Sequence, residues 1–358
     1  MSSDTASQAL ISARNIISAG LDYVRSGETS DQNQVFLYEL AHATAALSIS
    51  ESFISFGENG EEEKYMVDVF CADTLRSIAD MSFGLEEIWG IEKSDLEQLK
   101  NFVASHGTPQ NYSKVASMKA NSYLSDELQL VADTFRRFGR EHIEHLAEKV
   151  HREDLDVPES VIEGLADLGC FGLSIPQKYG GTAIGSALDN YGMVIATEEL
   201  SRASLSIGGS LITRPEILAR AIENGGTEKQ KKELLPKIAS GNYMSAVAVT
   251  EPDHGSDVAS ITTSARQKAS GAWELNGVKT WCTFAGRADL LMVLARTNPD
   301  SAASHRGLSV FVVQKERVKG HHFDLRQETG GRMQGRAIPT IGYRGMHCFE
   351  ICISNREV

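Results

Sequence analysis

Hydroxyl and glycine residues follow a strand-like run in the stretch SAVAVTEPDHGSD, residues 245–257. Val247 and Val249 alternate with small residues, which is typical of a strand, and a proline then ends it because proline cannot donate to a sheet ladder. Gly255 and Ser256 come directly after this strand. Glycine lets backbone amides approach a ligand closely, and the serine adds a hydroxyl group beside them. The stretch therefore predicts a ligand-binding turn at the end of a strand.

A second stretch, KTWCTFAG at residues 279–286, carries an indole and hydroxyl groups. Asn276-Gly277 just before it is a hairpin signal, so we expect a turn there with the stretch on the emerging strand. Trp281 and Thr283 are two residues apart, and side chains two apart in a strand point to the same face. An indole plane and a hydroxyl group on one face suit a flat heterocycle that forms hydrogen bonds.

The two stretches together resemble the acyl-CoA dehydrogenase family. The matching motifs are Val-Thr-Glu-Pro-x-x-Gly-Ser-Asp and then Lys-x-Trp-x-Thr, in that order, and the flanking chain over residues 124–358 follows the family as well. His254 stands where the family often has a smaller residue. The resemblance implies FAD bound between an α-helical domain and a small β-domain. The alternative is a plain barrel strand with a buried tryptophan and a glycine turn.

The resemblance also implies roles for individual residues. Residues 247–250 would line the isoalloxazine ring, with Thr250 bonding its edge, and Trp281 would cover one ring face. Gly255 and Ser256 would serve the flavin pyrophosphate and the pantetheine of an acyl-CoA substrate. The residues expected to bind the cofactor are therefore Val247, Val249, Thr250, Gly255, Ser256, Trp281, Cys282 and Thr283.

The reaction implied by the resemblance is α,β-dehydrogenation of an acyl-CoA thioester. A carboxylate removes the α-proton while the β-hydrogen leaves as hydride to the flavin. In the family the glutamate base comes from a C-terminal helical domain, which we expect to be absent from this chain, so no catalytic residue is predicted within it. Glu251 lies in the first motif, but the family uses this residue structurally. Family resemblance further suggests an electron-transfer flavoprotein as acceptor and a homodimer or tetramer.

Arg214 is the candidate for recognising the acyl group. It precedes Pro215, which we expect at the first position of a helix, where proline is tolerated. An arginine facing the acyl pocket would bind a carboxylate through two parallel hydrogen bonds, while the alternative is a solvated or helix-capping arginine. Arg332 and Arg336 are rival ligands for the carboxylate or the CoA phosphates.

The substrate has several possible identities. The N-terminal extension, the Thr-Arg-Pro-Glu segment and the glycine-rich insert at residues 330–339 resemble the branch of the family that oxidises methylsuccinyl-CoA to mesaconyl-CoA, in the ethylmalonyl-CoA pathway. One alternative is a dehydrogenase for another short, medium or branched acyl-CoA. A second alternative, from another class, is a catalytically inactive flavin-binding protein that binds a partner.

Composition and charge limit the classes of function. The chain of 358 residues has 41% hydrophobic and 23% charged residues, which is typical of a globular protein with more than one domain. A net charge of −13 argues against nucleic acid as a partner. Five scattered cysteines predict free thiols in the cytoplasm and no zinc site, and neither a membrane span nor a signal peptide is apparent.

The order of hydrophobic periods predicts an α+β multidomain protein. Residues 1–118 are expected to form an extra N-terminal helical domain ending in a linker from Gly107, residues 119–243 the helical domain of the acyl-CoA dehydrogenase family, and residues 244–358 an antiparallel β-barrel. The N-terminal domain either resembles the family's C-terminal bundle or is an unrelated accessory bundle. The expected strands are 244–249, 257–265, 273–275, 290–295, 308–313 and 348–353.

Overall fold

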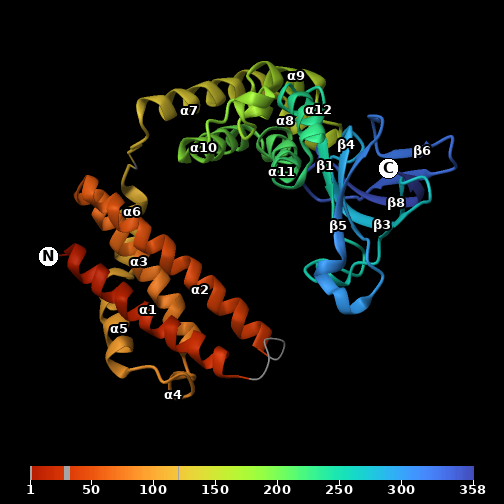
Figure 1. Ribbon diagram of the computed structural model, residues 1–358. Helices are drawn as coiled ribbons and strands as arrows, with labels where there is room; N and C mark the ends of the chain where they lie inside the picture. The colour runs from red at the N-terminus through yellow and green to blue at the C-terminus, as the bar shows by residue number, and fades with distance from the viewer. Residues whose placement is uncertain (1, 28–32, 120) are drawn as a thin grey trace. The chain divides into compact units, whose positions relative to one another are not determined.

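The computed structural model describes residues 2–27, 33–119 and 121–358. The chain divides into two compact units, residues 1–123 and 124–358, which are described separately (Figure 1). Across the described ranges, no helix is both long and apolar enough to cross a membrane.

The first unit is a helical bundle. Its core contains Ile16, Leu40, Leu75, Ile78 and Leu99, all almost inaccessible to solvent, so the predicted helical periodicity has placed apolar residues on inward faces. The helices are α1 (Ser2–Ser26), α2 (Gln34–Phe53), α3 (Glu61–Ser82), α4 (Glu86–Trp89), α5 (Lys93–His106) and α6 (Pro109–Ser117).

The linker predicted from Gly107 is wrong, because α6 occupies most of it. Thr108 caps this helix, its side chain accepting a hydrogen bond from the Asn111 backbone N–H, and Pro109 stands at the first helical position. The threonine-proline pair that suggested a break is therefore a helix start, since a proline in the first turn removes only an N–H that has no helical partner.

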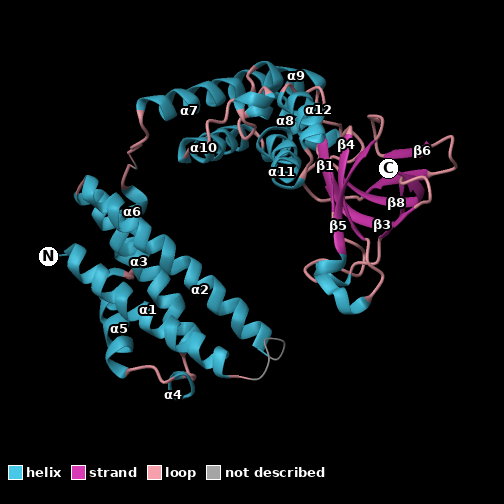
Figure 2. Cartoon of the chain, in the orientation of Figure 1, coloured by secondary structure: helices cyan, strands magenta, loops and turns pink. Residues whose placement is uncertain are grey.

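The second unit begins with helices and ends with strands, as Figure 2 shows. Ser125 caps the first helix as predicted, and Thr227 with Gln230 forms a capping box at the last. Short π-helical turns at 139–143 and 205–209 precede α8 and α11. The helices are α7 (Asp126–Phe138), α8 (Glu144–Glu153), α9 (Glu159–Asp167), α10 (Ala187–Ala203), α11 (Ser210–Gly225) and α12 (Glu228–Ala239).

The strands form one curled sheet with the order β1-β4-β2-β3-β8-β7-β6, and β5 also pairs with β4. Neighbours are antiparallel, except that β4 runs parallel to β1 and, at one residue pair, to β2. The predicted α+β fold class is confirmed. The strands are β1 (Ser245–Ala248), β2 (Ser264–Gln267), β3 (Trp273–Thr283), β4 (Leu290–Arg296), β5 (Leu308–Gln314), β6 (His322–Arg326), β7 (Arg332–Ala337) and β8 (Cys348–Glu357).

Three details of the strand prediction are wrong. Residues 257–263 form a short 3₁₀ turn and extended chain before β2, and β6 and β7 lie where no strand was expected. Asn276-Gly277 is not a hairpin turn but part of the continuous strand β3. The Asn276 side chain accepts a hydrogen bond from the Asn355 backbone N–H. These residues lie where the β3–β8 pairing shifts register.

Candidate functional site

The two motif stretches are joined by hydrogen bonds at the end of β1. The Lys279 ammonium group donates to the Val249 carbonyl oxygen at 2.8 Å, and the Thr280 backbone N–H donates to the Thr250 carbonyl oxygen at 2.9 Å. The end of β1 thus lies against the middle of β3. Residue 250 is held next to the backbone of Thr280, although about 30 residues separate them in sequence.

Glu251 anchors this junction as a buried carboxylate. It accepts hydrogen bonds of 2.8 Å from the backbone N–H groups of Thr262 and Thr263 and from the Thr262 hydroxyl group, and one of 3.0 Å from Lys279. Burial of the carboxyl group would by itself raise its pKa, but these donors outweigh burial and lower the pKa to about 2. Burial also lowers the pKa of Lys279, against the effect of the neighbouring carboxylate.

Trp281 presents its indole to solvent from a distorted part of β3. The β3–β8 pairing shifts register between Lys279 and Cys282, and Trp281 has a φ of 57°, in the left-handed region that bulky residues rarely adopt. The residue is 56% exposed. Strained, exposed aromatic residues are unfavourable for folding and concentrate at functional sites. Because the shift in register interrupts the strand alternation, the placement of Trp281 and Thr283 on one face stays a prediction.

Thr283 and Cys282 are more enclosed than Trp281. The Thr283 hydroxyl group lies 3.2 Å from the Cys348 sulfur, and the residue is 8% exposed. Cys282 is fully buried in the core of the sheet, and burial raises the pKa of its thiol to about 12. Both residues are therefore buried, and the Thr283 hydroxyl group is directed at the Cys348 sulfur.

The predicted ligand-binding turn is exposed. Glu251 and His254 exchange backbone hydrogen bonds of 2.9 and 3.2 Å, which closes a tight turn. Gly255 and Ser256 follow it and are exposed, and apart from residues 254–256 no atom of the described chain lies within 4 Å of where a Gly255 Cβ would be. Val247 and Val249 lie half-buried in the preceding strand segment. The turn thus offers open amide groups beside an apolar edge.

Arg214 lies within α11, and the predicted helix start at Pro215 is wrong. The helix begins at Ser210, directly after a π-helical turn, so Pro215 is an internal proline. The Ser245 hydroxyl group donates to the Arg214 carbonyl oxygen at 2.8 Å, which places the arginine beside the start of β1. A proline inside a helix removes one backbone N–H donor and its ring crowds the carbonyl group four residues earlier, yet α11 continues through Pro215.

The Arg214 guanidinium group keeps unused donors. Its Nη2 atom lies 3.4 Å from the Tyr343 hydroxyl oxygen, and its Nε atom is buried with no hydrogen-bond partner among the described residues. Sequence reasoning missed Tyr343, which has a left-handed backbone with a φ of 63°. A single tyrosine about 130 residues from its partner gives no local signal. The pair offers a partly formed binding site for an anion or hydrogen-bond acceptor.

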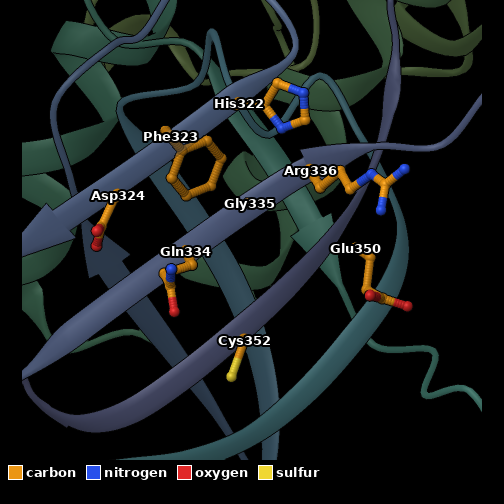
Figure 3. Close-up of a pocket in the computed structure, with 8 residues that line it drawn as sticks. All are labelled: His322, Phe323, Asp324, Gln334, Gly335, Arg336, Glu350 and Cys352. Carbon is orange, nitrogen blue, oxygen red and sulfur yellow. The ribbon is translucent and has the colours of Figure 1, made fainter.

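The rival arginines have different surroundings. Arg332 forms two hydrogen bonds of 2.7 and 2.6 Å to the carboxylate of Asp324, which occupies its guanidinium group. Arg336, His322 and Glu350 line a concave surface formed by β6, β7 and β8 (Figure 3). The hollow that it encloses has a volume of about 480 Å³. Because acidic and basic groups share this surface, it is less suited to a phosphate than a purely basic pocket.

Known proteins match the second unit. The sequence profile for the acyl-CoA dehydrogenase N-terminal domain matches residues 125–242, and that for the middle domain matches residues 246–355. A (2S)-methylsuccinyl-CoA dehydrogenase of Cereibacter sphaeroides is 39% identical over 264 residues, 71% of this chain and 46% of that protein. A mitochondrial isovaleryl-CoA dehydrogenase of Solanum tuberosum is 32% identical over 265 residues, 74% of this chain and 58% of that protein.

A solved structure agrees with these matches. The structure of a glutaryl-coenzyme A dehydrogenase in complex with glutaryl-CoA superposes with a TM-score of 0.57 at 31% identity, covering 67% of this chain and 56% of that chain. The chain spans about half the length of the curated relatives it matches.

Proposed function

The chain belongs to the acyl-CoA dehydrogenase family, and on this premise we propose that it takes part in the FAD-dependent α,β-dehydrogenation of an acyl-CoA thioester. The observation that carries the proposal is the exposed Trp281 in a strained backbone, directly after Thr280, whose N–H donates to the Thr250 carbonyl oxygen. An indole that stays exposed to solvent despite the strain in its backbone is well suited to lie against a flat ring.

The residues at this site fit a flavin. Trp281 would cover one face of the isoalloxazine. Four residues would lie along the edge of the ring, namely Val247, Val249, Thr250 and Thr283. The open amides at Gly255 and Ser256 suit a pyrophosphate and a pantetheine, since backbone N–H groups bind such acceptors. Cys282 would contribute its backbone. FAD in this position would supply the hydride acceptor for the substrate β-hydrogen.

Glu251 is not the base in this proposal. Each of its oxygens accepts hydrogen bonds from the protein, and its low pKa makes it a poor proton acceptor at neutral pH. Its role is to hold the two motifs together. We assign proton abstraction to a glutamate outside residues 1–358, in the C-terminal helical domain expected from the family.

We further propose a dicarboxylic acyl-CoA as substrate, with (2S)-methylsuccinyl-CoA converted to mesaconyl-CoA. The buried Arg214 Nε, which has no hydrogen-bond partner within the described ranges, and the adjacent Tyr343 hydroxyl group would together bind the distal carboxylate. The similarity to a methylsuccinyl-CoA dehydrogenase supports this choice. The similarity to an isovaleryl-CoA dehydrogenase supports the second candidate, a branched monocarboxylic acyl-CoA.

Other parts of the proposal concern domains and partners. We assign residues 1–118 to an accessory helical domain, 119–243 to the family's N-terminal domain and 244–358 to its middle domain. We propose an electron-transfer flavoprotein as electron acceptor, a homodimer or tetramer as the assembly, and the cytoplasm as the location.

Substrate oxidation by the full-length protein tests these assignments. Purified protein is assayed with methylsuccinyl-CoA, isovaleryl-CoA and butyryl-CoA and an artificial electron acceptor. Arg214→Gln should reduce kcat/KM for methylsuccinyl-CoA by about 100-fold or more, the typical cost of leaving a carboxylate unpaired, and reduce that for isovaleryl-CoA much less. Arg220→Gln is the matched control, because Arg220 lies on the same helix but pairs at the surface with Glu216.

Three outcomes separate the candidates. Equal losses for both substrates in Arg214→Gln contradict the carboxylate role and leave the family activity standing. Preference for isovaleryl-CoA selects the second candidate. Flavin binding without turnover of any ester favours an inactive flavin-binding protein.

A further inference from the structure

Three side chains that could bind a metal ion converge where the helices of the second unit meet its sheet. Asp154 ends α8, His321 precedes β6, and His347 precedes β8. One oxygen of the aspartate and one nitrogen of each histidine lie within 4.8 Å of one another. The proposed dehydrogenation uses none of these side chains.

The distances between these atoms match the spacing of ligands around a small ion. The Nε2 atoms of His321 and His347 lie 3.2 Å apart, His347 Nε2 lies 3.2 Å from Asp154 Oδ1, and His321 Nε2 lies 3.8 Å from Asp154 Oδ2. In a tetrahedral zinc site, bonds of roughly 2.0–2.1 Å put neighbouring ligand atoms about 3.3–3.4 Å apart. His347 faces one oxygen of Asp154 and His321 faces the other, while one atom from each of the three residues lies within 4.8 Å of the others. A rotation of the Asp154 carboxylate would therefore bring one oxygen and both Nε2 atoms to one ion.

A second carboxylate orients the buried histidine. His347 Nδ1 lies 3.2 Å from Asp156 Oδ1, and Asp156 Oδ2 accepts a 2.8 Å hydrogen bond from the Gly320 backbone N–H. Histidines that bind metals usually donate their other ring N–H to a carboxylate, which directs the free lone pair at the ion. With Nδ1 protonated in this way, His347 Nε2 points its lone pair toward Asp154 and His321.

The backbone holds two of these residues in unusual conformations. Asp154 has a φ of 54° and His347 a φ of 31°, both in the left-handed region. Asp154 is the left-handed C-cap of α8, a conformation that aspartate tolerates, whereas the conformation of His347 persists only because its surroundings impose it. Asp154 and His321 are partly exposed, with side-chain exposures of 43% and 38%, so an ion can reach the cluster from solvent.

We propose that Asp154, His321 and His347 form a binding site for a divalent transition-metal ion of the zinc class, with water in the fourth position. Imidazole and carboxylate ligands suit such ions. The ion would tie the chain after α8 to the sheet and take no part in electron transfer. It would also steady the flavin-binding edge, because the His347 carbonyl oxygen accepts a 2.9 Å hydrogen bond from the Phe284 N–H, next to Thr283.

The alternative to a metal ion is a proton on His347 Nε2. A doubly protonated His347 could donate to Asp154 and Asp156 together. Burial disfavours the charged ring, yet hydrogen bonds to these carboxylates raise the pKa of His347. Arg344, whose Nε lies 3.6 Å from Asp154 Oδ1, also competes with a cation for that carboxylate. The two explanations differ in one measurable property, which is whether the cluster takes up zinc.

Calorimetric titration with zinc chloride tests the site. The full-length protein is freed of metal with a chelator and carries Cys352→Ser, because Cys352 is an exposed thiol that could bind zinc independently. We expect one zinc ion per chain. Asp154→Asn and His321→Gln should each weaken binding at least tenfold, and zinc should raise the melting temperature of the parent but not of these variants. Asparagine tolerates the left-handed backbone at residue 154, so this variant should fold.

His322→Gln is the matched control. His322 adjoins His321 in sequence but lines the concave surface of Figure 3 and does not belong to the cluster. The zinc affinity of the His322→Gln variant should equal that of the parent protein. Absence of zinc binding at micromolar concentration overturns the proposal in favour of the proton. Undiminished binding in His321→Gln, or loss in His322→Gln alone, also overturns it, and none of these results depends on dehydrogenase activity.

Discussion

Lys279 and Glu251 form an ion pair in which Nζ and Oε1 are 3.0 Å apart and the side chains are 0% and 3% exposed. Lys279 also donates to the Val249 carbonyl oxygen, so one ammonium group joins the carboxylate to the end of β1. Burying two charges is costly, and this pair lies where it sets the alignment of the two motif stretches. The pair therefore serves geometry more than net stability.

Removal of the ammonium group should unfold this junction. Lys279→Met leaves Glu251 buried without its cation, which typically costs about 3–5 kcal/mol of unfolding free energy. The free energy is measured by urea denaturation followed by circular dichroism. The double variant Lys279→Met/Glu251→Gln should recover part of the loss, because no uncompensated charge remains in it.

A surface pair supplies the control for this variant. Lys268 lies 2.9 Å from Glu357 and 3.5 Å from Glu274, and its side chain is more exposed. Lys268→Met should leave the urea midpoint nearly unchanged, since exposed ion pairs contribute little. Equal losses in Lys268→Met and Lys279→Met would show that burial is not the reason for the effect.

Glu251 should also make the unit sensitive to acid. Its pKa is lowered from 4.5 to about 2 in the folded chain, so the folded state favours the ionised carboxylate. This contribution is fully present above pH 4.5 and is lost as the pH falls toward 2, because the unfolded chain binds the proton first. The loss amounts to roughly 3 kcal/mol. Urea midpoints measured from pH 6 to pH 2 should fall less steeply in Glu251→Gln than in the parent protein.

Trp281 should matter for flavin binding more than for folding. Trp281→Ala removes a side chain that is more than half exposed, so the melting temperature should change little. Loss of aromatic contact should weaken FAD binding about tenfold, equivalent to roughly 1.4 kcal/mol. Quenching of flavin fluorescence measures this affinity in the full-length protein.

Trp273→Phe serves as the comparison for Trp281→Ala. Trp273 lies at the opposite end of β3, where its ring contacts Phe311 at a centroid distance of 5.5 Å. Its replacement should leave FAD affinity unchanged. If Trp281→Ala bound FAD as tightly as the parent, the proposed ring contact would be wrong.

Local patterns in the sequence predicted the helices and most of the strands, because the residues that form each pattern lie close together in the chain. The capping residue Ser125 is an example, since its partner is only three residues away. Contacts between distant segments left no such signal. Asp154 and His347 meet across 193 positions, and nothing in either neighbourhood indicates the other.

Turn signals were misread where tertiary contacts use the same residues differently. Thr108-Pro109 suggested a linker but begins α6, and Pro215 suggested a helix start but lies inside α11. Thr108 forms the capping hydrogen bond expected of a threonine, and both prolines lack the backbone N–H that a helix interior uses. The surrounding helices decide whether such a proline begins, ends or interrupts a helix, and that information is not local.

Gly277 allows a direct test of the corrected interpretation of β3. Its φ is 153°, and a Cβ placed there would lie 2.4 Å from the Thr263 hydroxyl oxygen and 2.7 Å from the Thr263 Cα. Gly277→Ala should therefore lower the unfolding free energy by about 1–3 kcal/mol, the usual cost of overpacking, as measured by urea denaturation. A residue in a solvated hairpin turn would have no such neighbour.

The matched substitution for this glycine is Gly225→Ala at the end of α11. Apart from its chain neighbours and the nearby backbone of its own helix, no atom of the described chain lies within 4 Å of the added methyl group. Alanine also favours a helix over glycine, so stability should be unchanged or slightly higher. A Gly277→Ala variant as stable as Gly225→Ala would mean that β3 does not pass so close to Thr263. That result would contradict the continuous course of β3 through Gly277 to Lys279 and Trp281.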